Sequence, residues 1–261
     1  MDDKILWIFL HTPRSGGTSL FKYIEKKLFP EETIRIDATK LSKKTAAEKK
    51  KIRFVTGHTT YFGIHKLIPG KIPRYITILR DPAEMLVSLY HSRMDEFQEN
   101  RKQSFEKWYS LRKRNETTLL FDELFRSTNK KIVLFHIIKV KLRLILDKID
   151  KTKTIHTFLK KLRKKQNSLS VEKEKFQNAK KLLDECWFIC ITEHLNDDSK
   201  FLFKGMGIKG KLKNSGVSKI PRKLFTLDKK TREKIYQENP LDVELYNYAL
   251  KLNKAKKEKF S

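Results

Sequence analysis

The feature that most constrains the fold is a polar, glycine-containing turn between two apolar segments near the N-terminus. The apolar run 5–10 predicts a strand, and the amphipathic run 18–28 predicts a helix. The residues between them, 11–17, read His-Thr-Pro-Arg-Ser-Gly-Gly. A strand, a glycine turn and a helix in this order direct backbone N–H groups and the positive end of the helix dipole toward one point. We therefore expect a site for a phosphate-like anion at this turn.

The side chains of the turn suit an oxyanion ligand. Gly16 and Gly17 permit backbone angles and close approaches that a Cβ atom would block. Thr18 and Ser19 offer hydroxyl donors and can cap the helix, and Arg14 adds a cation with a fork of donors. The simpler alternative is an ordinary strand-to-helix turn rich in small residues. The turn is not a triphosphatase P-loop of the form G-x-x-x-x-G-K-[ST], because no lysine follows the second glycine.

A second polar junction follows the alternating run 74–79, which predicts another strand. The Asp-Pro pair after Arg80 suits the cap and first position of a helix over 82–93. Arg80 ends the strand, and Ser88 lies within the helix. Because ligands of open α/β sheets bind at the carboxyl ends of the strands, we expect Arg80 and Ser88 to hold a second phosphate, apart from the first.

Together the two junctions resemble the signatures of the sulfotransferases that use 3′-phosphoadenosine 5′-phosphosulfate (PAPS). The family's 5′-phosphosulfate loop, P-K-x-G-G-T-S, is similar to Pro13-Arg14-Ser15-Gly16-Gly17-Thr18-Ser19. Its 3′-phosphate site, R-D-P-x-x-x-x-x-S-x-Y, is similar to Arg80-Asp81-Pro82 followed by Ser88 and Tyr90, with Arg93 close behind. The resemblance implies a P-loop-like, three-layer α/β fold around a mostly parallel sheet. It also implies PAPS as the sulfuryl donor and no metal cofactor.

A third segment resembles one branch of this family, the carbohydrate sulfotransferases related to the heparan 2-O enzymes. The segment 53–63 is similar to that branch's strand followed by Gly-His, whose histidine is the catalytic base, and this places the role on His58. On spacing alone, a histidine at a strand end that only caps a turn is the better interpretation of His58 than a catalytic base. The strand over 187–191, which ends in Thr-Glu, resembles the branch's late core strand. Lys213 belongs to a basic stretch, 209–215, where these enzymes place a loop over the cofactor.

The resemblance implies transfer of a sulfuryl group to a hydroxyl of a carbohydrate or glycolipid. It covers residues 5–93 well and 186–250 loosely. Arg14 departs from the family, which has lysine there. Arginine keeps the charge and binds oxyanions but does not titrate, so we expect Arg14 to stabilise charge on the leaving oxygen and not to donate a proton. A neutral imidazole at His58 suits proton removal from the acceptor near neutral pH.

Two other classes of function stay open. One is a magnesium-dependent phosphotransferase that uses a nucleotide triphosphate. The other is a nucleic-acid-binding or membrane-binding protein on an inactive enzyme fold, which the net charge of +28 suggests. Residues 130–165 alone hold thirteen Lys or Arg against two acids. This excess fits a solvated surface, docking on anionic lipid, or steering of an anionic polysaccharide; a specific nucleic-acid partner is not expected, and no oligomeric state is predicted.

The chain is expected to form one sulfotransferase domain over 1–261, with a helical insertion or cap at about 94–185 over the acceptor cleft and a frayed basic tail at about 251–261. Other strands are expected at 33–36 and 53–56, and other helices at 41–50, 196–204, 228–238 and 240–253, with several between 98 and 185. Cys186 and Cys190 are predicted to be core thiols of a reducing compartment. Because no segment reaches about 20 apolar residues, we expect a cytoplasmic protein that can meet a membrane at its surface.

Overall fold

The computed structural model describes residues 4–28, 33–35, 41, 44–57, 60–96, 103–126, 169–212 and 225–259. The strands are β1 (Ile5–Leu10), β2 (Thr33–Arg35), β3 (Phe54–Gly57), β4 (Ile72–Leu79) and β5 (Cys186–Ile191). The helices are α1 (Gly17–Leu28), α3 (Ala46–Lys51), α4 (Pro82–Glu96), α5 (Phe105–Ser110), α6 (Glu116–Arg126), α9 (Leu169–Glu185), α10 (Leu195–Met206), α11 (Lys229–Glu238) and α12 (Pro240–Glu258). Two short 3-10 helices are η1 (Ile64–Leu67) and η3 (Thr192–His194).

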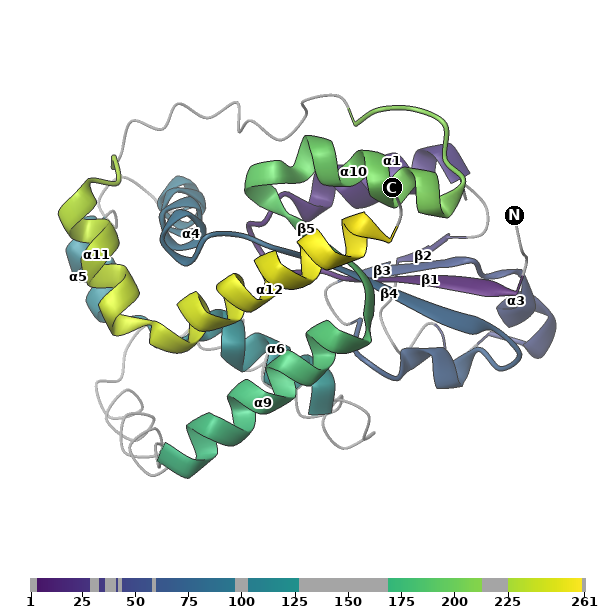
Figure 1. Cartoon of the computed structure of the whole chain (residues 1–261), viewed down its shortest axis with the longest axis horizontal. Coiled ribbons are helices and arrows are strands. Elements are labelled where there is room, and N and C mark those ends of the chain that lie inside the picture. The colour runs from purple at the N-terminus through teal and green to yellow at the C-terminus, as the bar shows by residue number, and fades with distance from the viewer. Residues whose placement is uncertain are drawn as a thin grey trace.

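The five strands form one sheet in the order β2-β3-β1-β4-β5, with β1 at its centre (Figure 1). Every pair of neighbours is parallel: β1 with β3 and with β4, β2 with β3, and β4 with β5. Parallel neighbours need crossover connections, and these connections place helices on the faces of the sheet. The predicted α/β fold with a central parallel sheet is therefore confirmed.

Both faces of the sheet are buried, which explains why its strands read as continuous apolar runs. In β1, Leu6, Ile8 and Leu10 face a core that α6, α9 and α12 complete. The alternate residues Trp7 and Phe9 face a second core formed with α1 and α10. Figure 1 shows α1 and α10 above the strands and α6 and α9 below them. The period of two along β1 thus sorts its side chains between two layers of helices.

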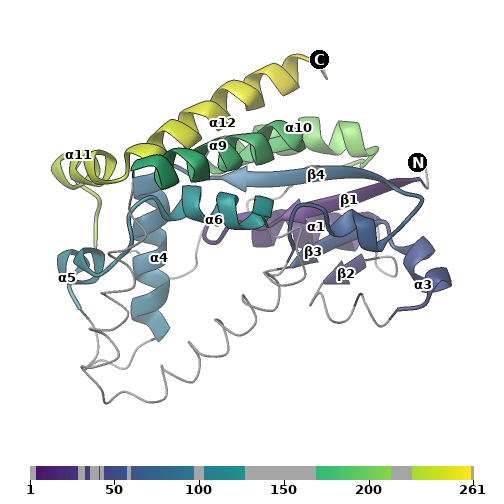
Figure 2. The same cartoon turned by 90° about the horizontal axis from the view of Figure 1, so that it is seen from below.

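A third apolar cluster lies beyond the carboxyl end of β4, where Figures 1 and 2 show α4, α5 and α11 gathered together. Tyr90 of α4, Phe105 of α5 and Ile235 of α11 are buried in it. Helices α5, α6 and α9 belong to the expected helical insertion. Residues 97–102 and 127–168 of that region lie outside the described residues, and the whole basic stretch 130–165 lies among them.

Side-chain caps set the starts of several helices. The side chain of Thr45 accepts a hydrogen bond from the N–H of Glu48, and the Glu48 carboxylate accepts one from the N–H of Thr45. This reciprocal pair starts α3 at residue 46, later than the predicted start. Asp228 caps α11, and Pro240 occupies the first turn of α12. In the described part of the chain, no helix combines the length and apolar content that crossing a bilayer would require.

The predicted fraying of the C-terminal tail is wrong for most of its length, because α12 continues to Glu258. Asn253 is buried, and its amide donates to the carbonyl of Ile189 at 2.7 Å and to Asp198 at 3.0 Å. The ammonium of Lys257 pairs with the same buried Asp198. The sequence predicted a frayed basic tail here. Instead, the side chains of Asn253 and Lys257 bind the end of α12 to β5 and α10.

The two cysteines lie on β5, and both are buried and free. Burial raises the pKa of the Cys186 thiol to about 12 and raises that of Cys190 as well. Both side chains are therefore protonated thiols in the core, as predicted.

Replacing Asn253 with alanine should lower the free energy of unfolding by about 1–3 kcal/mol, because the buried carbonyl of Ile189 loses its amide donor. Urea unfolding followed by circular dichroism measures the change. Lys254→Ala, at the neighbouring exposed position, is the control and should change stability by less than about 0.5 kcal/mol. Equal effects of the two substitutions would contradict this account of the C-terminal helix.

Candidate functional site

The candidate site lies where the carboxyl ends of β1 and β4 meet. The two strands pair in register, with Leu10 opposite Thr77. The hydroxyl of Thr77 donates to the carbonyl of Leu10 at 3.0 Å, and the buried hydroxyl of Thr12 donates to the carbonyl of Ile78. These bonds continue the strand pairing past the end of β1. As a result, the polar turn that follows β1 begins beside the end of β4.

The turn has the unusual backbone that its glycines predict. Gly16 has φ of 77°, and Arg14 has φ of 61°, which is rare for a residue with a Cβ atom. Such a conformation costs about 1–3 kcal/mol and concentrates at functional sites. Gly17 opens α1, and a Cβ atom there would lie 2.9 Å from Cδ2 of His11 and 3.0 Å from Cζ of Phe9. Gly17 is thus required because the helix packs tightly on the end of β1.

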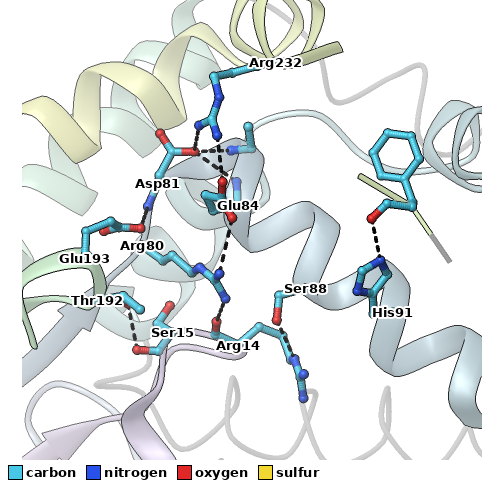
Figure 3. Close-up of polar contacts among 12 residues, drawn as sticks. Arg14, Ser15, Arg80, Asp81, Glu84, Ser88, His91, Thr192, Glu193 and Arg232 are labelled. Atoms are coloured by element: carbon cyan, nitrogen blue, oxygen red, sulfur yellow. Dashed lines mark hydrogen bonds and ion pairs between the residues drawn. The ribbon is translucent and has the colours of Figure 1, made fainter. Parts of the chain in front are cut away.

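Arg80 and Ser88 both lie against this turn (Figure 3). The Arg80 guanidinium donates from Nη1 to the carbonyl oxygen of Arg14 at 3.1 Å. In the other direction, Nε of Arg14 donates to the hydroxyl of Ser88 at 3.3 Å. The paired residues are 66 and 74 positions apart in the sequence. The structure therefore brings Arg14, Arg80 and Ser88 together, and the two predicted anion-binding segments form one continuous surface.

Asp81 has a structural role at the start of α4. Its carboxylate accepts hydrogen bonds from the N–H groups of Ala83 and Glu84, each at 3.0 Å, as the Asp-Pro pair predicts. Its own N–H donates to the carboxylate of Glu193 at 3.1 Å. The residue after Arg80 is thus fixed on both sides, and this limits the positions that the Arg80 side chain can reach.

Thr192 ties the polar turn to the end of β4. Its hydroxyl lies 2.8 Å from the carbonyl oxygen of Ser15 and 3.0 Å from that of Leu79. Glu193, the next residue, accepts hydrogen bonds from Asp81 and from the hydroxyl of Tyr246 at 2.9 Å. The Thr-Glu pair that the sequence placed after a late core strand therefore contacts both predicted anion-binding segments.

Arg232 of α11 is a residue of this site that sequence reasoning missed. Its guanidinium donates from Nη1 to Asp81 at 3.1 Å and from Nη2 to Glu84 at 2.7 Å. Glu84 also pairs with Nη2 of Arg80, at 3.4 Å. A hydrogen bond from Arg232 to Tyr236 and its bond with Glu84 raise the pKa of Arg232 above its ordinary value. No local pattern marks Arg232, because its partners are about 150 positions away.

The remaining residues that the motifs or the predicted site include lie in different surroundings. Tyr90 lies in the third apolar cluster, where its hydroxyl donates to the carbonyl of Gln103 at 2.6 Å, and it is a core residue. Thr18 is exposed on the first turn of α1. The N–H of Ser19 donates to the carbonyl oxygen of Gly16 at 3.2 Å. His58 and Lys213 both lie outside the described residues.

The arrangement suits a ligand with two anionic groups. The polar turn leads into the N-terminus of α1, whose first N–H groups favour an anion, and Arg14 adds a positive charge there. The Arg80 guanidinium and the Ser88 hydroxyl supply a second set of donors beside it. The Arg80 side chain is 15% exposed, so it is partly shielded from water and still open to a ligand.

Comparison with family models finds one match, to the sulfotransferase domain, over residues 10–205. The matched region contains the polar turn, Arg80, Ser88 and the Thr-Glu pair after β5. It ends within α10, so α11 and α12 lie outside it. A search of curated proteins gave no match.

Gly17→Ala should destabilise the protein by about 1–3 kcal/mol, because a methyl group at this position overpacks against His11 and Phe9. Chemical denaturation measures the loss. The neighbouring variant Thr18→Ala changes an exposed residue of the same turn and should alter stability by less than about 0.5 kcal/mol. A Gly17→Ala protein as stable as the wild type would show that the helix can withdraw from β1 at no cost.

Proposed function

The chain belongs to the sulfotransferase family, and on this premise we propose that it transfers a sulfuryl group from PAPS to a hydroxyl of a carbohydrate or glycolipid. One observation carries the proposal. The side chain of Arg14 contacts Ser88, and the carbonyl of Arg14 contacts Arg80. The two segments that resemble the 5′-phosphosulfate loop and the 3′-phosphate site therefore touch each other. A single adenosine nucleotide with phosphates on the 3′ and 5′ oxygens of one ribose needs two neighbouring anion sites.

The residues of the site fit such a nucleotide. The polar turn, with left-handed backbone at Arg14 and Gly16, leads directly into a helix N-terminus. We propose that the turn holds the 5′-phosphosulfate through its backbone and through Arg14, Ser15, Gly16 and Gly17, together with Thr18 and Ser19 at the start of α1. Arg80 and Ser88 would hold the 3′-phosphate, and Lys213 would close over the nucleotide.

When bound, PAPS supplies an activated sulfuryl group. Arg14 and the backbone donors of the turn would stabilise the negative charge that develops on the leaving oxygen, and each well-placed donor contributes about 3 kcal/mol. These donors are fixed before the reaction, so no reorganisation is needed. His58 would accept the proton of the acceptor hydroxyl, a role that suits an imidazole near neutral pH.

The acceptor class rests on the sequence. The segment 53–63, which contains β3, resembles the carbohydrate branch of the family. The net charge of +28 favours an anionic partner, either a polysaccharide or the surface of a membrane that carries a glycolipid.

Arg80→Gln should weaken binding of adenosine 3′,5′-bisphosphate by at least about tenfold, because a hydrogen bond to a charged group contributes about 1.5–3 kcal/mol. Binding of adenosine 5′-monophosphate should change little, since that nucleotide lacks the 3′-phosphate. Calorimetric titration measures both affinities. Arg126→Gln, on α6, removes the same charge from an ion pair with Asp122, away from the residues of the candidate site, and is the matched control. The assignment fails if the bisphosphate binds the Arg80 and Arg126 variants with the same affinity.

His58→Ala should lower kcat by about 100-fold or more while leaving affinity for the bisphosphate unchanged, because a general base acts on the acceptor and not on the nucleotide. The assay follows transfer of labelled sulfur from PAPS to a panel of glycans. Turnover should persist in the presence of a chelator, whereas a magnesium-dependent phosphotransferase would lose activity. Full turnover by the His58 variant would remove this residue from the mechanism.

A further inference from the structure

We propose that Arg232 is a positioning residue for the nucleotide site: it holds the carboxylate of Glu84 and so reduces the competition of that carboxylate with an anionic ligand for the Arg80 guanidinium. The inference rests on the proposed function, because it concerns the site assigned to the 3′-phosphate. It adds a role for α11, which lies outside the region that matches the sulfotransferase domain.

The distances show how Glu84 is shared. Its Oε1 lies 2.7 Å from Nη2 of Arg232, a short charge-assisted hydrogen bond. Its Oε2 lies 3.4 Å from Nη2 of Arg80, which is a longer and weaker contact. Figure 3 shows Glu84 between the two guanidinium groups. Glu84 is thus bound mainly by Arg232 and more weakly by Arg80.

Removing Arg232 would change the charge that a phosphate meets at this site. Asp81, which caps α4, and Glu84 in its first turn place two carboxylates beside Arg80, and Arg232 contacts both. Without Arg232, Glu84 would have Arg80 as its remaining cationic partner among these residues. The carboxylate would then compete with a phosphate for the same guanidinium, and it would also repel the phosphate.

Packing fixes α11 at a position from which Arg232 can hold the carboxylate of Glu84. The ring of Phe225, just before α11, stacks on Phe105 with 4.3 Å between ring centroids. The carbonyl of Phe225 accepts a hydrogen bond from Nε2 of His91 on α4 at 3.1 Å. Within α11, Ile235 is fully buried. Arg232 therefore projects from an anchored element onto the start of α4.

Calorimetric titration with adenosine 3′,5′-bisphosphate and adenosine 5′-monophosphate tests the proposal. Arg232→Gln should lower the affinity for the bisphosphate by about tenfold and the affinity for the monophosphate by less than about threefold. Adding Glu84→Gln to that variant should restore bisphosphate affinity to within about threefold of the wild type, because the competing charge is gone. Lys234→Gln, an exposed position on α11, removes the same charge and should bind as the wild type does.

The outcomes separate the two proposals. A wild-type protein that does not bind the bisphosphate overturns the proposed function and this inference together. If the wild type binds and Arg232→Gln binds equally well, only the inference is overturned. The inference is also overturned if Arg232→Gln lowers the affinity for both nucleotides alike, or if adding Glu84→Gln does not restore affinity for the bisphosphate. Glu84→Gln alone, which does not depend on the folding of the Arg232 variant, should bind the bisphosphate at least as tightly as the wild type; weaker binding overturns the inference.

Discussion

The pairing of β1 with β4 is the constraint on which the candidate site depends. Two parallel neighbours end at the same edge of the sheet, so the segments that follow them meet there although they are far apart in the sequence. Hydroxyl groups of Thr12 and Thr77 extend this pairing beyond the strands. Arg80 then reaches the carbonyl of Arg14, and the two anion-binding segments become one surface.

The start of α4 joins this surface to the C-terminal part of the chain. Asp81 caps the helix while it receives Arg232 from α11 and bonds to Glu193 after β5. Elements from three regions of the chain thus converge on the residue that follows Arg80. A change in α11 can therefore reach the candidate site through a few charge-assisted hydrogen bonds, without any change in the sheet.

The sequence predicted the parts of the fold that local physics determines. Alternation and apolar runs marked the strands, and the turn residues marked the loop at Arg14 and the junction at Arg80. The sequence did not indicate the polar contacts between residues that are far apart in the chain. Arg232 belongs to a highly charged helix, and Asn253 belongs to a lysine-rich segment, so each resembles a solvated residue until its partners are known. Tyr90 matched a site motif, but it lies in an apolar cluster.

The most direct measurement is a crystal structure of the protein with adenosine 3′,5′-bisphosphate. The account predicts the 3′-phosphate within about 3.2 Å of donor atoms of Arg80 and Ser88. It also predicts the 5′-phosphate on the backbone N–H groups at the start of α1, and the carboxylate of Glu84 still on Arg232. A nucleotide bound elsewhere, or bound at the turn with Arg80 still held by Glu84 and away from the phosphate, would contradict it.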